Sequence, residues 1–326
     1  MSSQKTEYVE AIIATTHRVR DTVFSIEALE GAARQINEGQ RKVVMLAEHD
    51  HTCPPLGMTI AARVVPIEDG HHALQTVAAL YGYPKEIELP DSSIGLLQEL
   101  VEHPHPLTSG DFGDCSIPEV QIDAVNFGGY ENAQVFLLEL SAIARDIEYN
   151  VEFFERRSLI PDPEVIFKLG VALSTSWFGG KMAKAAADAL EPKLKRFLEV
   201  MCDTITKTAK NALPMTRPIT YVVKVNGKPN IDFVVKSRDP NVVISAFTGN
   251  FEDVAKDVSR LRQRFDAEMI QYLLNENGEW VFNFLLTGDG KTIGSKMSFD
   301  RRAVLLNQME AAARSKFDHS TDKTVD

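Results

Sequence analysis

In the first half of the chain, hydrophobic and polar residues alternate with the period of two that is typical of β-strands. In the middle, hydrophobic residues recur with a helical period, and both patterns occur in the remainder of the chain. Short β-branched or alternating runs predict strands over Tyr8–Thr15, Met58–Ile67 and His71–Tyr81. Asp69-Gly70 lies between the last two runs and is typical of a tight hairpin turn. The pattern therefore predicts a β-hairpin near the N-terminus.

Other N-terminal signals are local. Ser25 can cap a helix that ends near residues 37–39, and Lys42–Ala47 is a compact apolar run that predicts a buried strand. Residues 103–118 are rich in Pro, Gly, Ser and Asp and predict a long loop. Glu119–Phe127 and Ala133–Leu140 are further strand candidates on either side of a glycine pair.

The middle of the chain changes to a helical pattern after Leu159–Pro163, which is the strongest boundary signal. Apolar residues then recur at spacings of three and four and predict an amphipathic helix; they are Leu190, Leu194, Phe197, Met201 and Ile205. Pro192 predicts a break near Glu191, because proline is tolerated at the start of a helix.

A third pattern begins after Pro214. Ile219–Val225 and Ile231–Lys236 flank Asn226-Gly227, which predicts a second hairpin, and Asn250 can cap a helix over Phe251–Phe265. A three-stranded meander and a closing helix complete the pattern, over Met269–Leu274, Trp280–Thr287, Thr292–Phe299 and Ala303–Phe317. We therefore predict an α+β fold with a β-rich domain (1–158), a helical segment (159–212), a small α+β domain (213–317) and a flexible tail (318–326).

Composition and charge narrow the function classes. The chain has 326 residues, a formal net charge of −11 and 44% hydrophobic residues, which is typical of a globular protein. The acidic balance argues against a general nucleic-acid-binding protein. Three scattered cysteines and the absence of a signal-like N-terminus predict a cytoplasmic protein. The longest weakly polar stretch, Leu169–Gly180, is too short to span a membrane.

Six of the eight histidines fall between residues 49 and 105. His49 and His51 follow a predicted buried strand, and alternate residues on an extended segment point the same way. Together with Cys53 they could bind zinc, which is the metal-site alternative. The structural alternative is that both histidines bond to the backbone at the strand end.

The predicted hairpin decides which histidines can share a site. Its ten-residue first strand is about 33 Å long, so His71 and His72, just past the turn, lie far from His49. The return strand brings the chain back towards His49, and Ser92 and Ser93 follow soon afterwards. The geometry favours a site formed by His49 with these serines. Alternatively, the two serines cap a helix over residues 94–101.

A resemblance to a known family accompanies this arrangement. Residues 17–95 resemble the prohead (capsid maturation) proteases of tailed phages, which are related in fold to the herpesvirus assemblin proteases. The resemblance is carried by a helix, a buried strand, a His-Asp pair, a Pro-x-Gly and an acidic-Gly turn, namely Ser25–Asn37, Lys42–Ala47, His49-Asp50, Pro55-Leu56-Gly57 and Asp69-Gly70. It does not extend to the last 170 residues.

The resemblance implies roles for individual residues. Ser93-Ile94-Gly95-Leu96 is similar to the family's serine segment, with leucine in place of an aromatic residue. It implies that His49 is the general base and Ser93 the nucleophile, with Ser92 as the neighbouring alternative. A third, acidic member is left open among Asp111, Asp114, Glu119 and Asp123.

Three functions follow from these observations. The first is a serine-protease-like domain with a C-terminal module for assembly or effector action. The second is a non-enzymatic assembly or binding protein of phage or host-defence origin, in which the stripe from Leu190 to Ile205 forms an oligomer interface. The third is a metal-dependent hydrolase that uses His49 and His51. Protein partners or self-association are expected in the first two.

Overall fold

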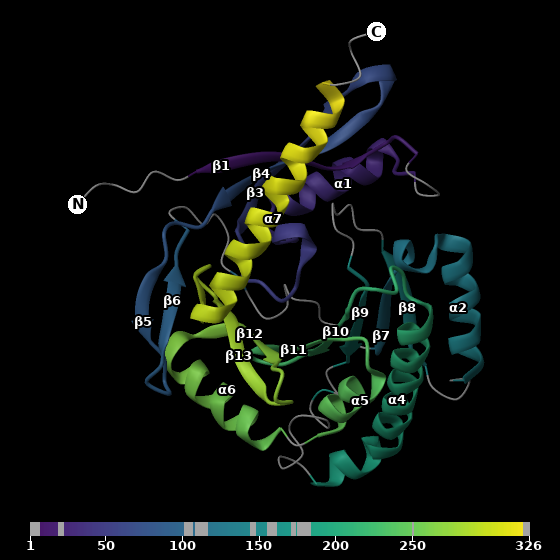
Figure 1. Cartoon of the computed structure of the whole chain (residues 1–326), viewed down its shortest axis with the longest axis vertical. Coiled ribbons are helices and arrows are strands. Elements are labelled where there is room, and N and C mark those ends of the chain that lie inside the picture. The colour runs from purple at the N-terminus through teal and green to yellow at the C-terminus, as the bar shows by residue number, and fades with distance from the viewer. Residues whose placement is uncertain are drawn as a thin grey trace.

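The structure is a computed structural model that describes residues 7–18, 23–100, 107, 117–143, 148–154, 162–170, 174, 184–249 and 251–321. Its strands form a four-stranded antiparallel sheet and a ten-stranded mixed sheet, with helices packed on both (Figure 1). The predicted α+β class is therefore confirmed. Within the described parts of the chain, no helix has the length and apolar character needed to cross a membrane.

The small sheet has the strand order β1–β4–β3–β2. Its strands are β1 (Tyr8–Thr15), β2 (Val44–Met45), β3 (Gly57–Pro66) and β4 (His72–Leu80). Helix α1 (Ile26–Asn37) is capped by Ser25, whose hydroxyl accepts a hydrogen bond from the backbone N–H of Ala28. The buried side of α1 packs on this sheet through Leu29, Ala33, Ile36, Ala62 and Leu74. The N-terminal hairpin and the capped helix are thus confirmed.

The large sheet has the order β5–β6–β14–β13–β12–β11–β10–β9–β7–β8. Its strands are β5 (Lys85–Glu88), β6 (Ile94–Gln98), β7 (Glu119–Asp123), β8 (Asn150–Phe154), β9 (Glu164–Leu169), β10 (Ile219–Val225), β11 (Asn230–Ser237), β12 (Ala267–Leu274), β13 (Trp280–Thr287) and β14 (Thr292–Ser295). The predicted β10–β11 hairpin and the β12–β13–β14 meander are both confirmed. The predicted domain division stays a prediction, and strands from both sides of residue 159 share this one sheet.

Three pairs of neighbouring strands in the large sheet are parallel, and each pair is joined by a helical crossover. Helix α2 (Tyr130–Ile143) joins β7 to β8. Helix α4 (Lys184–Asn211) joins β9 to β10, and helices α5 (Pro240–Thr248) and α6 (Glu252–Phe265) join β11 to β12. These helices cover one face of the sheet (Figure 1). The main hydrophobic core lies between them and that face.

The apolar stripe of α4 belongs to this core. Phe197, Met201 and Ile205 are fully buried against the sheet of their own chain. Burying such side chains stabilises the fold by about 1.5–3 kcal/mol each. The second functional hypothesis expects the stripe from Leu190 to Ile205 to form an oligomer interface, but these three members of the stripe are already covered by the sheet of their own chain.

Two strand predictions are wrong. Ala133–Leu140 lies inside α2, where Ala133, Phe136 and Leu140 fall on one buried face at spacings of three and four. The predicted strand Lys42–Ala47 is reduced to β2, after which the chain turns into a short 3-10 helix, η1 (Ala47–His49).

Two helix predictions are also wrong. Residues 94–98 form β6 because β5 and β14 pair with the segment on both sides, and such pairing overrides local helix signals. Helix α4 continues through Pro192 without the predicted break. Proline removes only one backbone hydrogen bond there, and the packing of the following turns on the sheet holds the helix.

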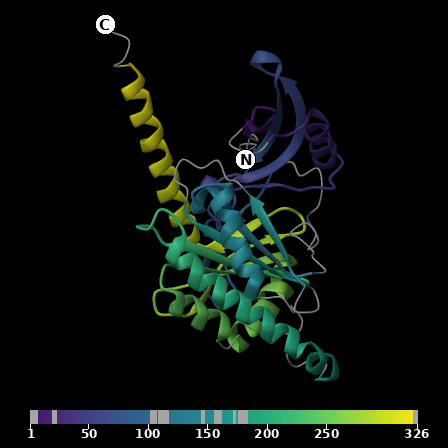
Figure 2. The ribbon, with the colours of Figure 1, turned by 90° about the vertical axis from the view of Figure 1, so that its right-hand side faces the viewer.

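The C-terminal helix α7 (Lys296–Thr321) starts earlier than predicted and has 26 residues. Its first turns pack against β6, β13, β14 and η1. Its C-terminal end extends away from both sheets (Figure 2). Helix α7 therefore links the loop after the small sheet's edge strand β2 with the large sheet.

Candidate functional site

The face of the large sheet opposite helices α2, α4, α5 and α6 carries polar side chains in rows. Register places Glu164, Thr220 and Lys236 side by side across β9, β10 and β11. An apolar row follows two residues further along each strand, formed by Ile166, Val222, Val234 and Leu273. The next row is polar again and contains Lys168, Lys224, Asp232 and Gln271.

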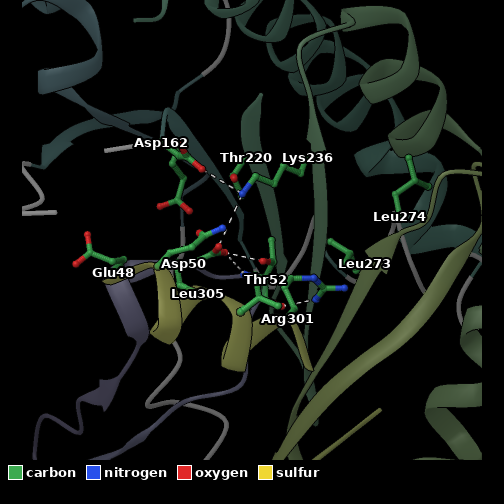
Figure 3. A pocket seen from close by; sticks show the side chains of 13 residues that line it. Glu48, Asp50, Thr52, Asp162, Thr220, Lys236, Leu273, Leu274, Arg301 and Leu305 are labelled. Atoms are coloured by element: carbon green, nitrogen blue, oxygen red, sulfur yellow. Dashed lines mark hydrogen bonds and ion pairs between the residues drawn. The ribbon is translucent and has the colours of Figure 1, made fainter. Parts of the chain in front are cut away.

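A pocket of about 390 Å³ opens over the first polar row. Its walls come from the loop after β2, from the ends of β9 to β12 and from α7 (Figure 3). The charged lining residues are Glu48, Asp50, Asp162, Glu164, Lys236 and Arg301. An apolar wall is formed by Leu273, Leu274, Val304 and Leu305.

The loop that enters the pocket has an unusual backbone. Glu48 and His49 are consecutive residues with φ of 49° and 57°, in the left-handed region that non-glycine residues rarely adopt. The Asp50 carboxylate then accepts hydrogen bonds from the backbone N–H and the hydroxyl of Thr52, at 2.7 and 2.6 Å. Such strained backbone persists where surrounding contacts hold it, and it is often found at functional sites.

Lys236 is the central cation of the pocket. Its Nζ lies 3.1 Å from Asp162 Oδ2 and 3.8 Å from Asp50 Oδ2 (Figure 3). Arg217 adds a second cation to Asp162, with Nη1 3.2 Å from Oδ1. Lys236 is thus already neutralised by carboxylates of the protein itself.

Arg301 is anchored at one nitrogen only, among the residues that the structure describes. Its Nη1 donates to the carbonyl oxygen of Thr52 at 2.7 Å and to Asn283 Oδ1 at 3.1 Å. Asn283 is itself fixed, because its Nδ2 donates to Thr52 O and to Gln271 Oε1. The Nη1 contacts therefore fix the guanidinium, Arg301 lines the pocket, and its Nε and Nη2 groups have no partner in the described parts of the chain.

Arg302, the next residue of α7, binds the same loop through its backbone carbonyl groups. Arg302 is buried and donates to the carbonyl oxygens of Pro54 and Pro55 and to Gln98 Oε1. Burial lowers the pKa of Arg302 to about 10. Two consecutive arginines of α7 therefore fix the loop that forms one wall of the pocket.

The predicted metal site would be formed by His49, His51 and Cys53. Within the described residues, no three His, Cys, Asp or Glu side chains are placed to hold a metal ion. His51 Nε2 lies 3.6 Å from Glu164 Oε2, while Cys53 is fully buried. Burial, aided by the charge of Asp50, raises the pKa of the Cys53 thiol to about 11, which disfavours the thiolate that zinc requires. A zinc site at His49, His51 and Cys53 stays a prediction.

Ser92 and Ser93, the predicted catalytic serines, directly precede the first residue of β6. Ser93 Oγ donates to Asp91 Oδ1 at 2.6 Å, which keeps the pKa of Asp91 below its usual range, and Ser92 adopts a left-handed backbone with φ of 65°. The opposite end of β6 is Gln98, beside Arg302, about 17 Å away along the strand. The described contacts of Ser93 do not include His49. A catalytic pair of His49 with Ser93 or Ser92 stays a prediction.

Four acidic residues were candidates for the third member of the predicted catalytic triad, and the structure describes two of them. Glu119 Oε1 pairs with Lys168 Nζ at 2.9 Å, and Asp123 caps a 3-10 turn by accepting from the N–H of Val125. Asp111 and Asp114 lie outside the described residues. Glu119 and Asp123 therefore have structural partners of their own.

Comparison with protein-family models, with curated proteins and with solved structures finds no match to this chain. The resemblance to prohead proteases is untested by these comparisons. Sequence reasoning located the loop with His49, Asp50 and His51 but missed Lys236 and Arg301. The signal available for Lys236 was its charge, since it occupies a strand position at which alternation predicts a side chain that faces the core.

Proposed function

We propose that this chain is a binding protein whose pocket holds a ligand with an anionic oxygen group attached to an apolar body. The observation that carries the proposal is the oriented guanidinium of Arg301, which is held by one nitrogen and lines the pocket. An arginine fixed in this way offers a planar pair of N–H donors that matches a carboxylate or a phosphate.

Arg301 is better suited than Lys236 to receive the anion. Lys236 already faces Asp50 and Asp162, so an incoming anion would be repelled by two carboxylates. Arg301 instead contacts a carbonyl and an amide oxygen, both uncharged. The anchoring contacts also reduce the conformational entropy that Arg301 would lose on binding.

The size and the walls of the pocket define the rest of the ligand. A volume of about 390 Å³ falls at the lower end of the range of small-molecule sites, about 300–1,000 Å³. The leucine and valine side chains next to Arg301 offer an apolar surface. A chain end of two apolar amino acids with a free carboxylate fits these requirements.

The proposal is tested with N-acetyl-leucyl-leucine, its C-terminal amide and hexyl phosphate as probes, measured by calorimetry and by thermal stabilisation. We expect the carboxylate to bind and the amide to bind at least about tenfold more weakly, because a charge-assisted hydrogen bond contributes about 1.5–3 kcal/mol. Preferential binding of hexyl phosphate would identify the anion as a phosphate. No binding of any probe at about 10 mM would overturn the proposal.

Two variants locate the binding to the pocket. Arg301→Gln removes the cation, and Val304→Asp places a negative charge on the apolar wall at an exposed position of α7. Arg314→Gln is the matched control, because it removes an exposed arginine from the same helix outside the pocket. We expect both pocket variants to weaken carboxylate binding at least about tenfold and the control to leave it unchanged. Equal affinity in all three variants would contradict the assignment.

Hydrolysis is the second candidate function, favoured by the contact of His51 with Glu164. The Glu164 side chain is buried, and a buried carboxylate beside an imidazole can orient it as a general base. The test is turnover of p-nitrophenyl butyrate and p-nitrophenyl phosphate by the wild type, His51→Asn and His71→Asn. His71 stacks on His17 at the hairpin turn and serves as the control. Turnover that is absent, or that survives His51→Asn, removes this candidate.

A further inference from the structure

Strand β1 differs from the three other edge strands of the two sheets. β2 has only two residues, and β5 has four, of which Lys85, Glu86 and Glu88 are charged. β8 has five residues, carries Glu152 and packs Val151 against the core. Short length and charge are the usual devices that prevent an edge strand from pairing with another chain.

β1 has eight residues, with the sequence YVEAIIAT, and lies at the periphery of the molecule (Figure 1). It contains no proline or glycine and one charged residue, Glu10. Ile12 and Ile13 are exposed large hydrophobic residues on it, although exposing them to water gains nothing for a monomer. Among the described strands only β4 pairs with β1, so β1 is an edge strand that carries exposed apolar side chains.

We propose that β1 of one copy pairs antiparallel with β1 of a second copy and joins the two small sheets into one eight-stranded sheet. The pairing is independent of the pocket and of the function proposed for it. A second copy is the occupant that this strand fits, because its sequence is self-complementary when it pairs with itself.

Symmetry limits the registers in which β1 can pair with itself, and side-chain chemistry favours one of them. A two-fold axis perpendicular to the joined sheet places one residue opposite its own symmetry mate. Centring on Glu10 would place two like charges directly opposite each other, which is destabilising. Centring on Ile12 places two exposed isoleucines together, sets Glu10 opposite Ala14 of the other copy and separates the two carboxylates by about 14 Å along the strands.

The size of the contact predicts a weak dimer. Eight residues extend over about 27 Å, and the register of β1 against β4 shifts between Ile12 and Ala14, so a bulge interrupts the strand. The contact is therefore smaller than the ~1,200 Å² of stable interfaces, and we expect it to dissociate at micromolar concentrations.

Sedimentation velocity of the full chain between about 1 and about 100 µM tests the proposal. We expect a monomer–dimer equilibrium in the wild type that Ile12→Lys abolishes, because a lysine on an edge strand disfavours pairing. Ile94→Lys is the matched control: Ile94 is 54% exposed and Ile12 53%, but Ile94 lies on an inner strand. A wild type that stays monomeric throughout, or a dimer that Ile12→Lys leaves intact, would overturn the proposal.

A cross-link tests the register without relying on the lysine variant. Cβ atoms directly opposite each other in an antiparallel pair are about 4.5–5.5 Å apart. Ile12→Cys should therefore form an intermolecular disulfide under mild oxidation, whereas Ile94→Cys, with the same native cysteines, should not. Cross-linking that is equal in the two variants would contradict pairing through β1.

Discussion

Across β9, β10 and β11, the two faces of the ten-stranded sheet differ in polarity. One face is apolar and covered by helices; Phe233 on this face is fully buried and contacts the rings of Phe251, Tyr272 and Trp280. The other face carries two rows of polar and charged side chains separated by one apolar row. The same strands supply both faces, because successive side chains point to opposite sides.

The two faces are expected to contribute differently to the stability of the fold. Apolar burial is favourable in proportion to area, whereas a buried ion pair loses hydration and often gains little over apolar residues of the same volume. The pair of Lys224 Nζ with Asp232 Oδ2, at 3.5 Å, is therefore weak support for the fold. The helix-covered face stabilises the sheet, and the polar face is free to hold a site such as the pocket.

The largest expected effect is on the apolar face. Phe233→Ala should lower the free energy of unfolding by about 3–5 kcal/mol, because it removes a large side chain and leaves a cavity among three rings. Urea denaturation monitored by circular dichroism measures the loss. Val242→Ala, at an exposed position of α5, is the control and should change stability by less than about 0.5 kcal/mol. A loss below about 1 kcal/mol for Phe233→Ala would remove the contrast between the faces.

Breaking the buried ion pair on the polar face should have the next largest effect. Asp232→Ala leaves the Lys224 ammonium without its carboxylate and should cost about 2–3 kcal/mol, less than a fully buried pair because Lys224 is 18% exposed. The double variant Lys224→Met with Asp232→Leu should recover most of this loss, since two apolar residues leave no unpaired charge. A double variant as unstable as Asp232→Ala would show that the pair itself stabilises the sheet.

The polar face should also give stability a pH dependence of defined sign. Burial raises the pKa of Asp232 above its usual 3.8, although Lys224 opposes the shift. The native state therefore binds this proton more tightly than the unfolded state, so the contribution of Asp232 is complete below pH 3.8 and is lost as the pH rises through the native pKa. The stability of the wild type relative to Asp232→Asn should fall as the pH rises from that value. A difference that grows with pH would contradict the assignment.

Much of the fold was predictable where the signal is local. Asp69-Gly70 and Asn226-Gly227 identified two hairpins, and Ser25 identified the start of α1, because turn and cap residues act on their immediate neighbours. Pairing of β6 with β14 joins residues about 200 positions apart and left no trace in either segment. The strand predicted over Ala133–Leu140 failed because its buried positions fit a helical period that the apolar run concealed.

The candidate site was also predictable only in part, namely in the loop that is local in sequence. The density of histidines led to the loop at His49 and His51, and Asp50 and Glu48 of that loop do line the pocket. Lys236 and Arg301 were missed because they reach the pocket from a strand and a helix almost 190 and 250 residues away. Only the tertiary packing of the loop and of α7 on the sheet brings these residues together.

The smallest effect is expected in the pocket itself. Lys236→Met should lower the free energy of unfolding by at most about 1 kcal/mol, because Lys236 is 32% exposed and its interactions are partly screened by water. Its two carboxylate partners also keep other contacts, Asp162 with Arg217 and Asp50 with Thr52. Urea denaturation at low and high salt measures this, with Lys256→Met on the surface of α6 as the control. A loss as large as that of Asp232→Ala would mean that the pocket charges support the fold, and the separation between a stabilising face and a functional face would fail.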